Sequence, residues 1–216
     1  MPAAWEINDG KPILLIGIPH RNTVNLSWAL AFRNLQVNVP SIFTCSAGTP
    51  IDIARNEIVK SALANDCQWV FFLDSDVECP PDTIPRLMSA QLPIISGVYG
   101  TRAPPLEPAV WREVQPSGKQ SIQFTPGTGL IEADFIGAGC LLVHISVFKA
   151  IKPPWFDWTL GREIPGDMTR GRSEDFEFCK KARERGYKIM VSTDIICRHS
   201  INNAYTQNNQ IQISQI

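Results

Sequence analysis

An apolar stretch that ends in two acids constrains the fold of this chain more than any other feature. Residues 69–73 read Trp-Val-Phe-Phe-Leu, and Asp74, Ser75 and Asp76 follow directly. Such an apolar run predicts a short strand buried on both faces, as in a parallel sheet covered by helices. Asp is depleted in strands, so the acids mark the strand's carboxyl end, where open α/β sheets bind ligands. Residues two apart point the same way, and we expect both carboxylates to face one crevice.

Two carboxylates this close together need a cation or strong donors between them. Hard oxygen ligands suit Mg²⁺ or Mn²⁺, which usually share their coordination shell with substrate phosphates. The alternative is a strand that ends in a solvated acidic turn, because Asp-x-Asp is short and common. The spacing of Asp74 and Asp76 alone is equally compatible with both interpretations.

The acidic strand is the third in an alternating series of strands and helices. The pattern predicts strands at 11–19, 39–45 and 69–73 and helices at 25–35 and 50–63. Thr49 followed by Pro50 is a favourable helix start, with a capping hydroxyl and then proline at the first helical position. A helix to about residue 90 and a strand at 93–99 continue the series. Strands connected through helices predict parallel pairing with right-handed crossovers.

The pattern changes after Gly100. Short strand-like runs at 110–114, 121–124 and 130–135 are separated by Pro and Gly turns, which is typical of hairpins. Helices are expected near 146–151 and at 173–185, where Ser173 caps acids in the first turn, and a last strand at 188–193. The predicted fold class is α/β, a mostly parallel sheet flanked by helices with a smaller mixed or antiparallel part in the second half.

We expect one domain over residues 1–199, with 11–99 as one half and 100–199 as the other. Residues 200–216 are rich in Asn and Gln and predict a loose polar tail. Residues 153–172 show no period and contain three arginines and several aromatic residues. A structureless segment of this length inside a compact domain is usually functional or disordered.

Composition and sequence patterns argue against several functional classes. The net charge of −1 argues against a general nucleic-acid or membrane-surface binder, which would carry a basic excess. No apolar run approaches the ~20 residues of a membrane span, and the first residues lack the pattern of a signal peptide, so we expect a cytoplasmic protein. The six cysteines form no C-x-x-C pair and are expected to be buried thiols rather than disulfides or zinc ligands.

Three chemical groups stand out along the chain: Asp74 with Asp76, Glu174 with Asp175, and His199. Each has an ordinary explanation when taken alone. Acids in the first turn of a helix stabilise its dipole, and a single histidine is more often a hydrogen-bonded surface residue than a ligand. Their combination on one α/β sheet, in this order, favours a functional site.

The ordered set of segments resembles the nucleotide-sugar glycosyltransferases of the GT-A fold and is similar to glycosyltransferase family two. The matching segments are ILLIGIP at 13–19, IARNEIVKSAL at 53–63, WVFFLDSDV at 69–77, FIGAGCLLV at 135–143, SEDFEFCKKARERG at 173–186, and His199. They span nearly the whole chain. Two positions depart from the family: 46–48 read Ser-Ala-Gly where members commonly carry an acid, and His20 replaces a usual aromatic residue.

The resemblance implies a role for each group. A divalent Mn or Mg ion would be held by Asp76, Asp74 and His199. Asp175, with Glu174 beside it, would be the catalytic base that takes the acceptor's proton. Contacts to the nucleotide sugar would come from Pro19, His20, Arg55, Asp74, Ser75 and Asp76. Gly139 and Trp155 would border the acceptor, and residues 160–172 would close over the donor, with Arg170 or Arg172 on phosphate.

The implied activity is metal-dependent, inverting transfer of a sugar from a nucleoside-diphosphate donor to the hydroxyl of a carbohydrate or other acceptor. Two alternatives stay open. A nucleotidyltransferase also uses acids on an α/β sheet, but it usually has a glycine-rich basic loop after the first strand, and residues 19–23 contain no glycine. A nucleotide-sugar-binding protein without catalysis is the other.

Overall fold

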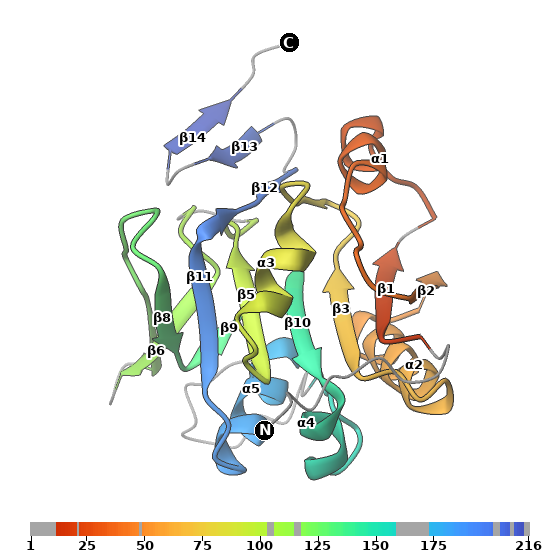
Figure 1. The fold of residues 1–216 in the computed structure, drawn as a ribbon. Coiled ribbons are helices and arrows are strands. Elements are labelled where there is room, and N and C mark those ends of the chain that lie inside the picture. The colour runs from red at the N-terminus through yellow and green to blue at the C-terminus, as the bar shows by residue number, and fades with distance from the viewer. Residues whose placement is uncertain are drawn as a thin grey trace.

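The computed structural model describes residues 12–20, 22–47, 49–102, 106–114, 118–158 and 173–200, and the backbone of 204–207 and 210–213. Its centre is a seven-stranded sheet with the order β2-β1-β3-β10-β5-β11-β8 (Figure 1). The strands are β1 (Leu14–His20), β2 (Ser41–Ala47), β3 (Trp69–Leu73), β5 (Ile94–Val98), β8 (Leu130–Ala133), β10 (Cys140–His144) and β11 (Ile189–Ile196). The sequence-based prediction of a large α/β sheet is confirmed.

The sheet is mostly but not wholly parallel. Strand β1 pairs in parallel with β2 and β3, and β11 pairs in parallel with β5. Strand β10 lies between β3 and β5 and is antiparallel to both, and β8 is antiparallel to β11. The sequence pattern did not predict a strand at Cys140–His144. A strand buried on both faces has the same apolar pattern in either direction, so neither its place nor its direction was predictable.

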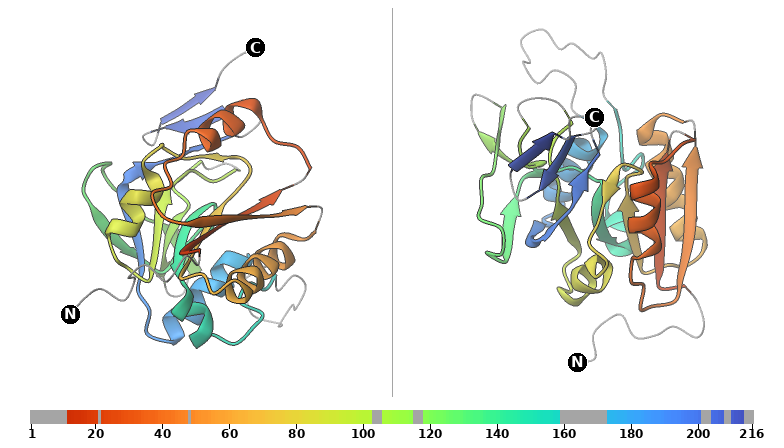
Figure 2. Two further views of the ribbon diagram at one scale, coloured as in Figure 1. Left: turned by 45° about the vertical axis from the view of Figure 1, so that its right-hand side comes forward. Right: turned by 90° about the horizontal axis from the view of Figure 1, so that it is seen from above.

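In the described part of the chain, five helices flank the sheet: α1 (Leu26–Arg33), α2 (Ile51–Ala64), α3 (Thr83–Ser89), α4 (Ile145–Ala150) and α5 (Glu174–Glu184). Seen from above, α3 lies on one side of the sheet and α2, α4 and α5 lie on the other (Figure 2). Helix α2 buries Ala54, Ile58 and Ala62 at helical spacing. It packs close to β1, because a Cβ on Gly17 would lie 2.3 Å from the Ile58 side chain.

The predicted start of α2 is wrong by one residue. Pro50 occupies the N-cap position instead of the first helical position, and no side chain caps the helix. Thr49 Oγ1 instead lies 3.3 Å from Ser46 Oγ. The predicted cap of α5 is in the right place, since Ser173 is its N-cap residue, but its hydroxyl contacts the Asp175 carboxylate rather than a backbone amide.

The strand that carries the acids lies in the centre of the core. Every residue of β3 is at most 1% exposed, and the Phe72 ring packs edge-on against Phe148 and Phe156. Side chains fixed on both faces hold the end of this strand in one place. Asp74 to Asp76 are therefore presented from a rigid support.

The second half contains the smaller antiparallel elements that the sequence predicts. A three-stranded sheet has the order β7 (Gly118–Ser121), β6 (Val110–Val114) and β9 (Phe135–Ile136). The strand expected at 121–124 thus lies earlier, and the run expected at 130–135 is divided between β8 and β9. Two further pairs are β4 (Val77–Glu78) with β12 (Arg198–His199), and β13 (Ala204–Gln207) with β14 (Gln210–Ile213).

The hairpin of β13 and β14 stands where the sequence predicted a loose tail, and it lies above the sheet in Figure 1. The predicted lid at 160–172 lies outside the described residues. Within the described ranges, no helix combines the length and apolar character needed to cross a membrane. All six cysteines have free thiols, and five of them are buried as the sequence predicted, whereas Cys45 is exposed.

Candidate active site

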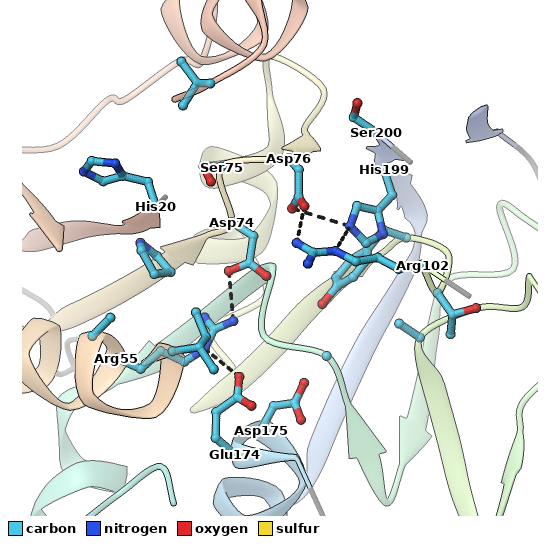
Figure 3. Close-up of a pocket in the computed structure, with 18 of the residues that line it drawn as sticks. His20, Arg55, Asp74, Ser75, Asp76, Arg102, Glu174, Asp175, His199 and Ser200 are labelled. Carbon is cyan, nitrogen blue, oxygen red and sulfur yellow. Dashed lines mark hydrogen bonds and ion pairs between the residues drawn. The ribbon is translucent and has the colours of Figure 1, made fainter. Parts of the chain in front are cut away.

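A cleft of about 850 Å³ opens at the carboxyl ends of β1, β3 and β5. Strand β1 brings His20, the turn after β3 brings Asp74 to Asp76, and the segment after β5 brings Tyr99 to Arg102. Helix α5 and strand β12 add acids and a histidine (Figure 3). Most of the residues singled out from the sequence line this one cleft: Pro19, His20, Arg55, Asp74, Ser75, Asp76, Glu174, Asp175 and His199.

Arg55 lies beneath the cleft and contacts two acids that come from different elements. Its Nη2 donates to Asp74 Oδ1 at 2.9 Å and its Nε to Glu174 Oε1 at 3.2 Å. Its Nη1 donates to the Ala138 carbonyl at 3.1 Å, and the side chain is only 2% exposed. Burial by itself would lower the pKa of Arg55, but the charges of Asp74 and Glu174 raise it above its ordinary value. The guanidinium is thus an internal cation that positions the acids, rather than a solvated helix arginine.

Asp74 is held on several sides. Its backbone amide donates to the Gly139 carbonyl at 3.0 Å, and its own carbonyl accepts from Trp28 Nε1 at 2.9 Å. A Cβ on Gly139 would lie 3.0 Å from Asp74 Oδ2 and 2.9 Å from the Tyr99 ring. Gly139 therefore permits a close backbone approach behind Asp74. It does not line the cleft, so its predicted contact with the acceptor has no support in this geometry.

Asp76 and His199 face each other across a second group of polar atoms. His199 Nε2 lies 3.4 Å from Asp76 Oδ1, and the guanidinium of Arg102 contacts both, with its Nε 3.3 Å from His199 Nε2 and its Nη2 on Asp76 Oδ2 (Figure 3). Burial would raise the pKa of Asp76, but its contacts with His199 and Arg102 outweigh burial and lower that pKa. Asp76 is therefore ionised at neutral pH.

The atoms of this second group fit a divalent cation. Asp76 Oδ1 is buried and has no hydrogen-bond partner among the described residues. His199 Nδ1 donates to the Gly100 carbonyl at 2.6 Å, which leaves Nε2, the nitrogen that accepts from Arg102 Nε and lies nearest Asp76, as the ring atom that could bind a metal. Metal-binding histidines usually show this arrangement, with the other ring nitrogen bonded to a carbonyl or carboxylate. Asp76 and His199 can thus share a metal, whereas Asp74 Oδ1 is engaged by Arg55.

The two acids of α5 have raised pKa values. Burial and the neighbouring Asp175 raise the pKa of Glu174 to about 7, against the pull of Arg55. Burial also raises the pKa of Asp175, while hydrogen bonds from Ser173 and the Phe176 amide oppose the shift. Among the described residues, both of these bonds reach Asp175 Oδ1, the amide at 2.9 Å. A carboxylate with a raised pKa at a cleft wall is suited to accept a proton near neutral pH.

Trp155 is not where the sequence analysis expected it. The indole is 6% exposed, donates from Nε1 to the Phe148 carbonyl at 2.8 Å, and packs against the Phe148 ring. Trp158, three residues later and 38% exposed, lines the cleft instead. A segment without hydrophobic period contains no signal that separates a core indole from a cleft indole.

Sequence reasoning also missed Tyr99 and Arg102. Both follow β5 at its carboxyl end and line the cleft. The hydroxyl of Tyr99 accepts the Gly139 amide at 2.8 Å, and burial raises its pKa well above the ordinary value. The signal that identified Asp74 and Asp76, polar residues directly after a buried strand, applies equally to residues 99–102 and could have found them.

Comparisons with known proteins agree with this fold. The family model Anp1 matches residues 50–107, about a quarter of the chain, which include Arg55, Asp74, Asp76 and Arg102. A search of curated proteins finds no match. Among solved structures, "Crystal Structure of A197 from STIV" has a TM-score of 0.64 at 16% identity, over 94% of each chain.

A second solved structure, "Crystal structure of GalNAc-T7 with UDP, GalNAc and Mn2+", has a TM-score of 0.56 at 10% identity. The match covers 89% of this chain and 44% of that one, so the chain spans less than half of that protein's length. The fold is of the GT-A type. At these identities the likeness establishes the fold and leaves the activity to be argued from the site.

Proposed function

We propose that the protein is a metal-dependent glycosyltransferase that moves a sugar from a nucleoside-diphosphate donor to an acceptor hydroxyl. The observation that carries the proposal is the convergence of Asp76 and His199 with Asp175 in one cleft at the carboxyl ends of the sheet. Two likenesses support it. Anp1 is a mannosyltransferase-related family, and the GalNAc-T7 structure contains UDP, GalNAc and Mn²⁺ in a chain of similar fold.

The cleft has separate places for the two halves of the reaction. Asp76 and His199 would hold Mn²⁺ or Mg²⁺ where the donor's diphosphate lies. When bound, such a cation offsets the negative charge that develops on a departing diphosphate. Pro19, His20 and Ser75 line the same cleft and would contact the nucleotide sugar.

Asp175 would act as the base. It takes the proton from the acceptor hydroxyl while that oxygen forms a bond to the anomeric carbon of the sugar. The bond from this carbon to the diphosphate oxygen breaks, and the nucleoside diphosphate leaves with the electron pair. A single displacement of this kind inverts the anomeric configuration. The raised pKa of Asp175 brings it closer to the working pH, which favours a general base.

Arg55 would act through the acids that it positions. Three of its N–H groups are used by Asp74, Glu174 and Ala138, and the guanidinium lies 5.8 Å from the centre of the Phe72 ring. We infer that Arg55 fixes the position of Asp74 relative to the start of α5. Asp74 would then contact the ribose or complete the metal shell from its remaining oxygen.

A donor screen tests the proposal. The full chain is incubated with a panel of nucleoside-diphosphate sugars in Mn²⁺, in Mg²⁺ and in chelator, and release of the nucleoside diphosphate is measured. We expect slow metal-dependent release with one donor class, which is lost in Asp76→Asn. If no nucleotide sugar binds or reacts under any of these conditions, the proposal is wrong.

A further inference from the structure

Three thiols converge directly behind the residues of the candidate site. Cys79 follows β4, Cys140 begins β10, and Cys197 joins β11 to β12. Their Sγ atoms all lie within 4.8 Å of one another, and their side chains are 6%, 0% and 0% exposed. The Sγ atoms of Cys79 and Cys197 are 3.5 Å apart. Single buried cysteines behave as small apolar residues. Three thiols from three segments that contact one another suggest a further role.

The strand register makes two of these cysteines a specific pair. Strands β4 and β12 are antiparallel, with Arg198 opposite Glu78 and His199 opposite Val77. One step further along the same register places Cys197 opposite Cys79. Residues directly opposite in an antiparallel pair have Cα atoms about 4.5–5.5 Å apart, which lies within the range of about 4.4–6.8 Å found for disulfides. Side-chain rotation alone can therefore bring the two sulfur atoms to bonding distance.

We propose that Cys79 and Cys197 are a disulfide-forming pair that covalently joins β4 to β12. The inference is independent of the proposed transferase activity. A small-molecule disulfide such as glutathione disulfide is the oxidant. Each cysteine loses its proton and one electron, the Cys79–Cys197 bond forms, and the S–S bond of the oxidant is reduced to two small thiols.

Cys140 lies outside this register. It begins β10, where its partner across the sheet is Leu73 of β3 rather than a cysteine. The strand pairing therefore favours the Cys79–Cys197 bond and leaves Cys140 as a free thiol.

The bond would join two segments that carry candidate metal ligands. Cys79 is three residues after Asp76, and Cys197 is two residues before His199. The linked residues are far apart in sequence, so the bond closes a long loop and restricts the unfolded chain strongly. We therefore expect the oxidised protein to unfold at a higher urea concentration than the reduced protein.

Refolding in glutathione buffers tests the pair. The reduced, urea-unfolded full chain is refolded at increasing ratios of oxidised to reduced glutathione, free thiols are alkylated, and the protein is digested and mapped by mass spectrometry. We expect a cross-link between the peptides of Cys79 and Cys197, with the other four cysteines alkylated. Cys140→Ser should retain the cross-link, and Cys45→Ser removes the exposed thiol that could join two molecules.

Urea unfolding supplies the second readout. The oxidised wild type should have a higher midpoint than the reduced wild type, and Cys197→Ser should show the same midpoint in both buffers. If Cys197→Ser does not fold, the map of the wild type decides alone. Six alkylated thiols after oxidative refolding, a bond mapped to Cys140, or a stoichiometric thiophilic metal that protects all three thiols would each overturn the proposal.

Discussion

The Nη2 atom of Arg55 donates to Oδ1 of Asp74 at 2.9 Å, from a side chain that is 2% exposed. The same guanidinium holds Glu174 through Nε. One buried cation therefore neutralises acids from the turn after β3 and from the first turn of α5. Through these ion pairs, Arg55 connects the two segments that form opposite sides of the cleft.

Arg55→Met should destabilise the fold by about 3–5 kcal/mol. Removing the cation leaves the buried Glu174 and the partly buried Asp74 without their partner, which is the costly way to break a buried pair. Urea denaturation measures the free energy of unfolding. The matched control is Arg86→Met, whose partner Asp82 lies 3.6 Å away at an exposed site and which should cost less than about 1 kcal/mol. Equal losses in both variants would contradict the assignment.

Asp175→Asn should reduce the rate of sugar transfer by roughly 10²–10⁴-fold, because the amide cannot accept the acceptor's proton. Donor affinity should stay near that of wild type, since Asp76 and His199 are intact. Glu174→Gln should be milder. Steady-state kinetics with donor titration separate the two effects, and Glu177→Gln on the same helix turn is the control. Full activity in Asp175→Asn would exclude it as the base.

Glu174 should make stability depend on pH. Its pKa rises from 4.5 in the unfolded chain to about 7 in the fold, so the folded state binds the extra proton between these values and unfolding releases it. Stability should therefore fall as the pH rises from about 4.5 to 7, by up to about 3 kcal/mol. Glu174→Gln should flatten this slope in urea titrations, while the exposed Glu57→Gln should follow wild type. An unchanged slope in Glu174→Gln would refute the shifted pKa.

Asp76→Asn should remove the metal dependence of nucleotide binding. In wild type, the donor's nucleoside diphosphate should bind much more tightly with Mn²⁺ than in chelator, because the cation links Asp76 and His199 to the diphosphate. In Asp76→Asn both affinities should be equally weak. Calorimetry measures them, with Asp82→Asn, at the half-exposed N-cap residue of α3, as the control. Equal affinity of wild type with and without Mn²⁺ would contradict the assignment of Asp76 as a metal ligand.

Arg102→Met should tighten the binding of Mn²⁺ alone by about 1.4- to fivefold. The guanidinium contacts both Asp76 and His199, so it competes with an added cation for the same atoms. It is 55% exposed, and an ion pair of this exposure is worth about 0.2–1 kcal/mol, which sets the size of the gain. Electron paramagnetic resonance of free Mn²⁺ measures the affinity. Arg112→Met, at an exposed strand position, should have no effect, and weaker binding in Arg102→Met would show that Arg102 supports the metal instead.

The positions of the acids could be predicted because the residues that determine them are close in sequence. A buried apolar strand followed at once by Asp74 and Asp76 has few placements in an α/β sheet, and Ser173 with the first-turn acids fixes the start of α5. Both patterns depend on neighbouring residues only. In the structure these acids line one cleft.

Features that depend on distant partners could not be predicted. Arg55 lies three residues before Ile58 on the buried face of α2, and only Glu174, 119 residues later, shows that a charged side chain has a partner there. The choice between Trp155 and Trp158 depends on which indole meets Phe148. The direction of β10 depends on two neighbours that are both remote in the chain.

The position of β10 has a consequence for how the two halves of the chain can be separated. Residues 94–98 belong by sequence to the first half, yet β5 pairs only with β10 and β11 in the central sheet, both from the second half. A fragment that ended at Tyr99 would leave β5 without either neighbour and expose the edge of β3. We therefore expect the two halves to unfold in one transition and to fail as exchangeable modules. A change in what the cleft binds has to come from the loops around it, because recombining the halves would break the sheet that supports them.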